Sequence, residues 1–212
     1  MKIESKTMDS FRRLRSAWAK RLGRWLDDRR GIAAVEFAII VPLLLAMYFV
    51  TMEAGQGLET NKKLGRVSST IADLVTQEQG FTAAELNAVL QIGAAIIQPY
   101  NRSNPQIYVA GLQFNNATPA VETVTWRRSL VNGAAGNAAP PATRAPVIPT
   151  SLKVANTFLV QVHVILDYNP VINWAGKESA TGFYSPFTLN FPMAETYYLR
   201  ARNGPTVTCT GC

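Results

Sequence analysis

Histidine and cysteine are scarce in this chain of 212 residues, which contains one histidine, His163, and two cysteines. A tetrahedral zinc site takes four Cys or His ligands, so one copy of the chain cannot fill such a site. The G-x-S-x-G, P-loop and H-E-x-x-H motifs are also missing. His163 and Asp167 are spaced roughly 13 Å apart along a predicted strand, too far for a hydrogen-bonded catalytic pair. We therefore predict no enzyme, no metal and no cofactor.

The two cysteines, Cys209 and Cys212, stand at the end of the sequence in "TCTGC". A redox-active C-x-x-C usually opens a helix in a thioredoxin-like unit, whereas this pair follows the last predicted strand. We expect a local disulfide formed in an oxidising compartment, with a pair of free thiols as the alternative.

Positive charge is scarce outside the N-terminus. Residues 1–30 hold ten Lys and Arg against four Asp and Glu, while the other 182 residues hold eleven against ten. A nucleic-acid-binding domain normally carries a basic face, and the part of this chain beyond residue 30 is close to neutral. We predict no nucleic-acid partner.

The basic N-terminal region has apolar residues at helical spacing between its arginines and lysines. Such a stripe is typical of a helix that lies on an anionic membrane surface, and a flexible basic tail is the alternative. The apolar positions are Phe11, Leu14, Trp18, Leu22, Trp25 and Leu26.

One long apolar run, Ile32–Met52, predicts a transmembrane helix. Its 21 residues would span roughly the 30 Å hydrocarbon core of a bilayer. The run contains Glu36 and, further along, Pro42, where a kink is expected. The charges before the run place the N-terminus in the cytoplasm and everything after residue 53 on the exported side. A cleaved secretory signal is the rival, but "YFVTMEAGQG" offers no small-residue cleavage pair.

Beyond the membrane the sequence predicts helices followed by strands. The membrane helix should continue outward, and Gly55 and Gly57 are where a break would fall. Thr82 and Glu85 form a capping box for a second helix, which Pro99 stops. Period-two patterns then predict strands, with Pro192 at an edge or break. The predicted strands cover residues 106–114, 121–126, 156–168 and 187–201, and an exposed loop covers 132–151.

These elements predict an α+β fold in which the helical region packs on an antiparallel β-sheet. The chain divides into a basic amphipathic cytoplasmic leader (1–31), a single-pass transmembrane helix (32–52) and an exported α+β domain (53–212). Trp126, Arg127 and Arg128 could form an anion or stacking site, but solvated arginines on an edge strand are the favoured interpretation.

The stretch "RRGIAAVEF" resembles the processing site of type IV prepilins, with Gly31, then Ile32 after the cut, and Glu36–Phe37 at the head of the apolar helix. The longer stretch "RRGIAAVEFAIIVPLLL" resembles the TadE-like family of minor pilins and pseudopilins in tight-adherence (Flp-type) pilus assembly. "IADLVTQ" (71–77) and "ETYYLRAR" (195–202) are similar to that family as well.

The resemblance implies a pilin-like fold, anchored in a bacterial inner membrane with a periplasmic domain or built into an extracellular pilus for adhesion. It also implies cleavage after Gly31 by a prepilin peptidase, and other pilins, pseudopilins and pilus assembly proteins as partners. Glu36 would then neutralise the new amino group of Ile32, on its own subunit or on a neighbour. A carboxylate in hydrocarbon is costly without such a partner.

Three alternatives stay open from the residues. Glu36 could instead extend to the cytoplasmic interface near Arg29. The chain could be an uncleaved, membrane-anchored envelope scaffold or binding module that never enters a filament. It could also be a tethered periplasmic enzyme, which predicts a polar pocket around His163.

Overall fold

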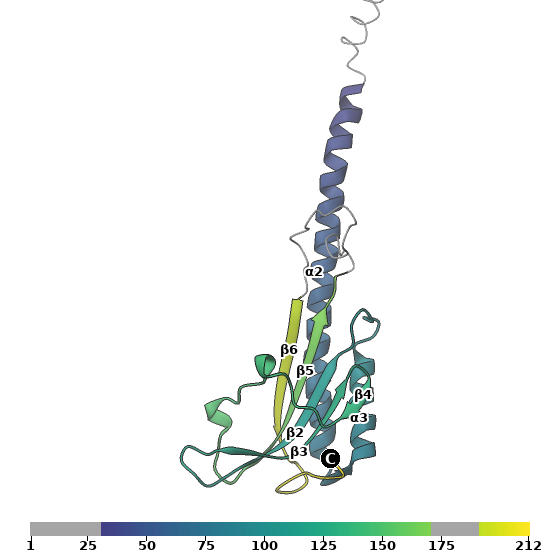
Figure 1. The fold of residues 1–212 in the computed structure, drawn as a ribbon. Helices are drawn as coiled ribbons and strands as arrows, with labels where there is room; N and C mark the ends of the chain where they lie inside the picture. Colours follow the sequence, from purple (N-terminus) through teal and green to yellow (C-terminus); the bar gives the residue numbers. More distant parts are fainter. Residues whose placement is uncertain (1–30, 171–190) are drawn as a thin grey trace, which may run out of the picture. The chain divides into compact units, whose positions relative to one another are not determined.

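The computed structural model describes residues 31–170 and 191–212, and it confirms the predicted α+β class. The first described element is one long helix, α2 (Ile32–Gln77), shown in Figure 1. It continues through Pro42, Gly55 and Gly57, so the glycines do not interrupt it. The chain divides into two units after Thr51, and residues 31–51 and 52–212 are described separately below.

The second unit contains a five-stranded sheet in the order β4-β3-β2-β5-β6, with every neighbouring pair antiparallel. The strands predicted at 106–114 and 156–168 are confirmed, and the one predicted at 121–126 runs further, to Val131. The last large strand lies at the sheet edge, as Pro192 indicated. The strands are β2 (Gln106–Phe114), β3 (Glu122–Val131), β4 (Ala134–Gly136), β5 (Phe158–Tyr168) and β6 (Phe191–Arg200).

The main core lies between one face of this sheet and the helices. Alternate side chains of β5 point to that face, which is the consequence of the period of two in a strand. Leu64, Val67 and Ile71 of α2 are fully buried against them. The β5 residues in this core are Phe158, Val160, Val162, Val164, Leu166 and Tyr168.

Helix α3 (Ala83–Ile96) begins at the predicted capping box. The Glu85 amide donates to Thr82 Oγ1 at 3.3 Å, and the Thr82 amide donates to Glu85 Oε2 at 2.8 Å. The backbone hydrogen bond from Thr82 lowers the pKa of Glu85. At the other end, Lys63 Nζ donates to the Gln98 carbonyl at 3.0 Å, so α3 runs antiparallel to α2. Gly93 allows this close approach, because a Cβ there would overlap the Ile71 side chain.

The C-terminal segment folds back over the end of α2. Strand β7 (Thr208–Thr210) pairs in parallel with β1 (Gly80–Thr82). The Arg202 amide donates to the Thr76 carbonyl at 3.0 Å, and the Arg202 guanidinium pairs with Asp73. The first of these bonds satisfies a carbonyl that the end of a helix leaves free. They also bring together the two family-like stretches 71–77 and 195–202, which lie far apart in sequence.

The opposite face of the sheet is covered by the chain between β4 and β5, which contains η2 (Ala142–Arg144) and η3 (Thr150–Leu152). Most of the predicted loop 132–151 is exposed, although it contains the short strand β4. Its half-buried residues are Gly136, Pro140, Arg144, Pro146 and Ile148. Ile148 packs beside a small second cluster. The buried members of that cluster are Leu112, Phe114, Ala120 and Leu159.

Candidate processing and assembly site

Residues 32–51 of α2 present apolar side chains outward on every side. Ile32, Phe37 and Leu43 are examples, each more than half exposed. Among the residues that the structure describes, α2 is the one helix long and apolar enough to cross a membrane, and none of its most apolar window is buried in protein. Apolar surface of this extent is costly in water, which favours a lipid environment for this part of the helix.

Gly31 directly precedes the first residue of α2. A Cβ built at Gly31 meets no atom within 4 Å, and its φ lies outside the left-handed region that favours glycine. Neither packing nor backbone conformation in the described chain therefore requires glycine at this position. Gly93 differs in this respect, because a Cβ at that position would overlap the Ile71 side chain.

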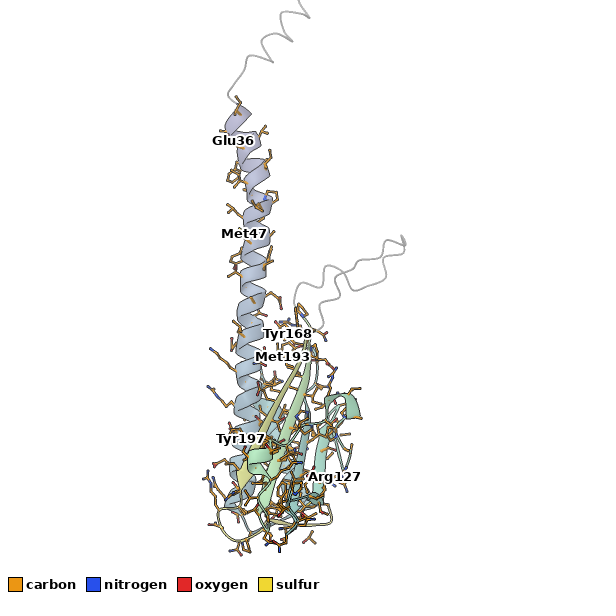
Figure 2. The ribbon with its side chains drawn as sticks, turned by 90° about the vertical axis from the view of Figure 1, so that its left-hand side faces the viewer. Glu36, Met47, Arg127, Tyr168, Met193 and Tyr197 are labelled. Carbon is orange, nitrogen blue, oxygen red and sulfur yellow. A yellow bond between two sulfur atoms is a disulfide. The ribbon has the colours of Figure 1, made fainter. Side chains whose placement is uncertain are left out.

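Glu36 lies one turn into α2, and Figure 2 shows its side chain projecting from the helix near its beginning. Within residues 31–170 and 191–212, its carboxylate contacts no cation and no hydrogen-bond donor. Arg29, the alternative partner, lies outside the described residues. Ile32 and Glu36 are four residues apart, a spacing that places two side chains on one helix face. The four predicted processing residues thus lie at the start of α2 or directly before it, and the carboxylate of Glu36 is exposed. They are Gly31, Ile32, Glu36 and Phe37.

The first charged residue after the apolar run, Glu53, belongs to a polar and aromatic cluster in the second unit. Tyr168 Oη donates to Glu53 Oε1 at 2.5 Å, and Arg102 lies 3.7 Å from the same oxygen. Burial, followed by the hydrogen bond to Glu53, raises the pKa of Tyr168 to about 12. Tyr100 stacks on Tyr168 with ring centroids 5.2 Å apart. The cluster joins α2 to the end of β5, and the sequence analysis did not find it.

The opposite end of the second unit holds the two cysteines. Cys209 and Cys212 lie at disulfide distance, with Cα atoms 5.7 Å apart. Cys209 pairs with Phe81 in the β1–β7 register, and both cysteines pack against the main core. A bond here would fix β7 beside the start of α3.

His163 and Asp167 lie on the outer face of β5 but have different partners. His163 Nδ1 is 2.8 Å from Thr196 Oγ1, and Asp167 binds Arg144 at 2.7 Å. His163 is 3% exposed, so it does not line an open polar pocket. Burial lowers the pKa of His163. This arrangement matches the expectation that the two residues do not form a catalytic pair.

Trp126, Arg127 and Arg128 do not act as one surface group. Trp126 is buried, and its Nε1 donates to the Val207 carbonyl at 2.7 Å. Arg128 Nε donates to Asn87 Oδ1 of α3 at 2.7 Å. β3 is an edge strand, as predicted, only in its first part. Its last residues, 129–131, pair with β4, which forms the edge of the sheet there. The stacking alternative is wrong for Trp126, whose indole ties the sheet to the C-terminal segment.

Comparison with known proteins gives one result that bears on this site. A family model described as TadE-like protein matches residues 31–73. The chain is TadE-like in this segment. The match begins at Gly31 and ends within α2, so it covers the predicted processing residues, the apolar run and α2 as far as residue 73. No curated protein and no solved structure matches the chain.

The TadE-like segment implies involvement in a function related to the Tad pilus and an association with a membrane. The resemblance inferred from "RRGIAAVEFAIIVPLLL" is thereby confirmed. The family match stops before α3 and the sheet, so it says nothing about residues 74–212.

Proposed function

We propose that this TadE-like chain is a minor pilin or pseudopilin-like component of a tight-adherence (Flp-type) pilus assembly and secretion system. It acts by anchoring in the membrane and by packing against other subunits. The observation that carries the proposal is that Gly31 and Glu36 occur together at the start of α2. The first is a glycine without a structural reason, and the second is a carboxylate inside an apolar helix.

The proposed orientation follows from charge. The ten Lys and Arg residues before the apolar run hold the N-terminus in the cytoplasm, and the unit formed by residues 52–212 is periplasmic. An oxidising periplasm also suits the cysteine pair. The membrane is then the bacterial inner membrane, where a prepilin peptidase would meet Gly31 from the cytoplasmic side.

The proposed processing step is hydrolysis of the Gly31–Ile32 peptide bond. Water adds across the bond, leaving a carboxylate on Gly31 and an ammonium group on Ile32. Glu36 is one helical turn away from that ammonium, roughly 6 Å along the axis. Pairing of the two charges, within a subunit or between neighbours, offsets the cost of holding either one in hydrocarbon.

The alternative function is an uncleaved membrane-anchored scaffold or binding module. It is favoured by the long leader, residues 1–31, which carries an apolar stripe of its own. In that case Glu36 pairs elsewhere, and subunit packing in a filament is not required.

Intact-mass spectrometry of the chain extracted from its native membranes separates the two functions. We expect the mass of a chain that begins at Ile32, because cleavage follows Gly31. A Gly31→Ala variant should keep the leader, whereas a Gly55→Ala variant should be cleaved like the natural chain, since a Cβ at Gly55 also meets nothing within 4 Å. A full-length natural chain in cells with an active prepilin peptidase would contradict the proposal and favour the scaffold.

A further inference from the structure

The outer face of the sheet is covered by residues 139–154, which we call the covering segment. Within the described chain, hydrogen bonds between main-chain atoms of this segment all join its own residues. Side chains hold the segment to the sheet instead. Arg144 Nη1 binds Asp167 Oδ1 of β5 at 2.7 Å, and Tyr198 Oη of β6 donates to the Val147 carbonyl at 3.3 Å. The covering segment can therefore leave the sheet without disrupting any pair of strands.

His163 lies beneath the covering segment with one ring nitrogen unpaired. Its side chain is 3% exposed, and the Arg144 carbonyl lies close enough to influence its pKa. His163 Nδ1 is 2.8 Å from Thr196 Oγ1, but no described residue forms a hydrogen bond with Nε2. Buried polar atoms without a partner are rare in proteins. A neutral ring carries hydrogen on one nitrogen only, whereas a protonated ring carries it on both and would leave the N–H at Nε2 without an acceptor.

Both carboxylates that the described residues place on this face of the sheet are already paired with cations of the covering segment. Asp167 is bound to Arg144, and Glu122 is bound to Lys153 at 3.1 Å. The titratable and charged side chains on this face and on the covering segment are Tyr108, Glu122, Arg127, Asp167, Tyr198, Arg200, Arg144 and Lys153. Neither carboxylate pairs with His163, so a positive charge on its buried ring would have no anionic partner among the described residues.

We propose that protonation of His163 in mild acid releases the covering segment from the sheet and uncovers the apolar cluster that Ile148 and Leu152 pack against. In the open arrangement the charged ring reaches water, which supplies the acceptor that Nε2 lacks. The covering segment gives way because the residues on the other sides of the ring, Tyr108 and Thr196, belong to paired strands. This inference concerns the second unit alone and does not rest on a role in pilus assembly.

The direction of the pH dependence follows from burial. Burial lowers the pKa of His163 and outweighs the effect of the Arg144 carbonyl, which raises it. In acid the closed arrangement therefore binds fewer protons than the open one, whose histidine has the ordinary pKa of about 6.5. The closed arrangement is favoured above that pH and loses stability as the pH falls below it. Between about pH 7.5 and about pH 5, one such histidine can raise the open fraction by at most roughly thirtyfold.

Thiol labelling of the detergent-solubilised full chain tests the release. The reporter is Ile148→Cys, since Ile148 is half-buried against the apolar cluster, and the matched control is Val147→Cys, since Val147 is 87% exposed. Dithiodipyridine labels thiols in mild acid as well as at neutral pH, and the ratio of the two labelling rates cancels the pH dependence of the reagent. We expect this ratio to rise by about tenfold between about pH 7.5 and about pH 5. In a His163→Gln background the ratio should stay constant.

Val89→Cys separates local release of the covering segment from general unfolding. Val89 packs against the main core from α3, on the other side of the sheet, so its labelling relative to Val147→Cys should not change with pH. The chain without a reporter gives the blank for Cys209 and Cys212. An unchanged ratio at Ile148→Cys, the same rise in the His163→Gln background, or an equal rise at Val89→Cys would overturn the proposal.

Arg144→Gln provides a test that leaves the buried ring in place. Loss of the ion pair with Asp167 should raise the Ile148→Cys ratio about two- to threefold at about pH 7.5, the size expected for a partly exposed pair. Circular dichroism at the same pH checks that His163→Gln folds, and Arg144→Gln carries the test if it does not. A ratio that Arg144→Gln leaves unchanged would also overturn the proposal, because the covering segment would then not be held where the release requires.

Discussion

A Glu36→Gln variant should remain in the membrane but fail to support pilus assembly. Glutamine keeps the size and the helical tendency of the side chain and removes its charge. The ammonium group of Ile32 after cleavage would then have no anionic partner in the hydrocarbon, a penalty that charged groups inside membranes rarely bear. We expect the number of pili per cell, counted by electron microscopy, to fall by about tenfold or more.

Glu59→Gln is the matched control for this variant. Glu59 lies on the same helix, beyond the apolar run, and pairs at 3.0 Å with Lys63 four residues later. Its side chain is exposed, so the loss of this pair should change little. Equal pili in the two variants would contradict the role assigned to Glu36, provided that both proteins reach the membrane in equal amounts.

A Gly111→Ala variant should lose about 2–3 kcal/mol of unfolding free energy. A Cβ at Gly111 would stand 2.5 Å from Trp126 Nε1 and 2.8 Å from Phe158 Cζ, and both rings are held in the core. The indole would have to move, and its hydrogen bond to the Val207 carbonyl would weaken with it. That bond is one of several that hold the C-terminal segment, and Val207 directly precedes β7, so the change should also loosen β7.

Thermal unfolding of the detergent-solubilised full chain, followed by circular dichroism, measures this effect. We expect Tm to fall by roughly 5–10 °C for Gly111→Ala. Gly136→Ala is the control, since Gly136 is also in a strand and the nearest atom to a Cβ there is Ser129 Oγ at 3.9 Å. A Tm for Gly111→Ala within a degree or so of the control would show that the core relaxes around the added methyl group.

The local elements of the fold could be predicted because their signals lie close together in sequence. The capping box at Thr82 and Glu85 marked the start of α3, and the alternation in "FLVQVHVILDY" marked both the strand β5 and its buried side. The apolar run predicted the N-terminal part of α2 for the same reason. Each of these patterns reports on neighbours within a few residues.

The long-range contacts could not be predicted in this way. Glu53, Arg102 and Tyr168 come from three distant segments, and no periodicity in the sequence links them. The stacking alternative placed Trp126 at the surface beside two arginines, whereas its hydrogen-bond partner, Val207, lies 81 residues away. A tryptophan next to charged residues can belong to either face of a strand, and only the register with β2 places it in the core.

Long-range contacts also fix both ends of the second unit, where α2 meets the sheet and the C-terminal segment. At the end nearer the apolar run in sequence, the Glu53 cluster fixes β5 to α2. At the other, Arg202 ties the C-terminal segment to Asp73 and Thr76. With both ends fixed, residues 52–77 of α2 are held in one position against the sheet and the C-terminal segment.

The most direct measurement of the central claim is a count of pili on cells that lack this chain and on the same cells with the chain restored. The account predicts that pili are lost or greatly reduced without the chain and return with the natural sequence, but not with Glu36→Gln. Unchanged piliation in cells without the chain would contradict its assignment to pilus assembly.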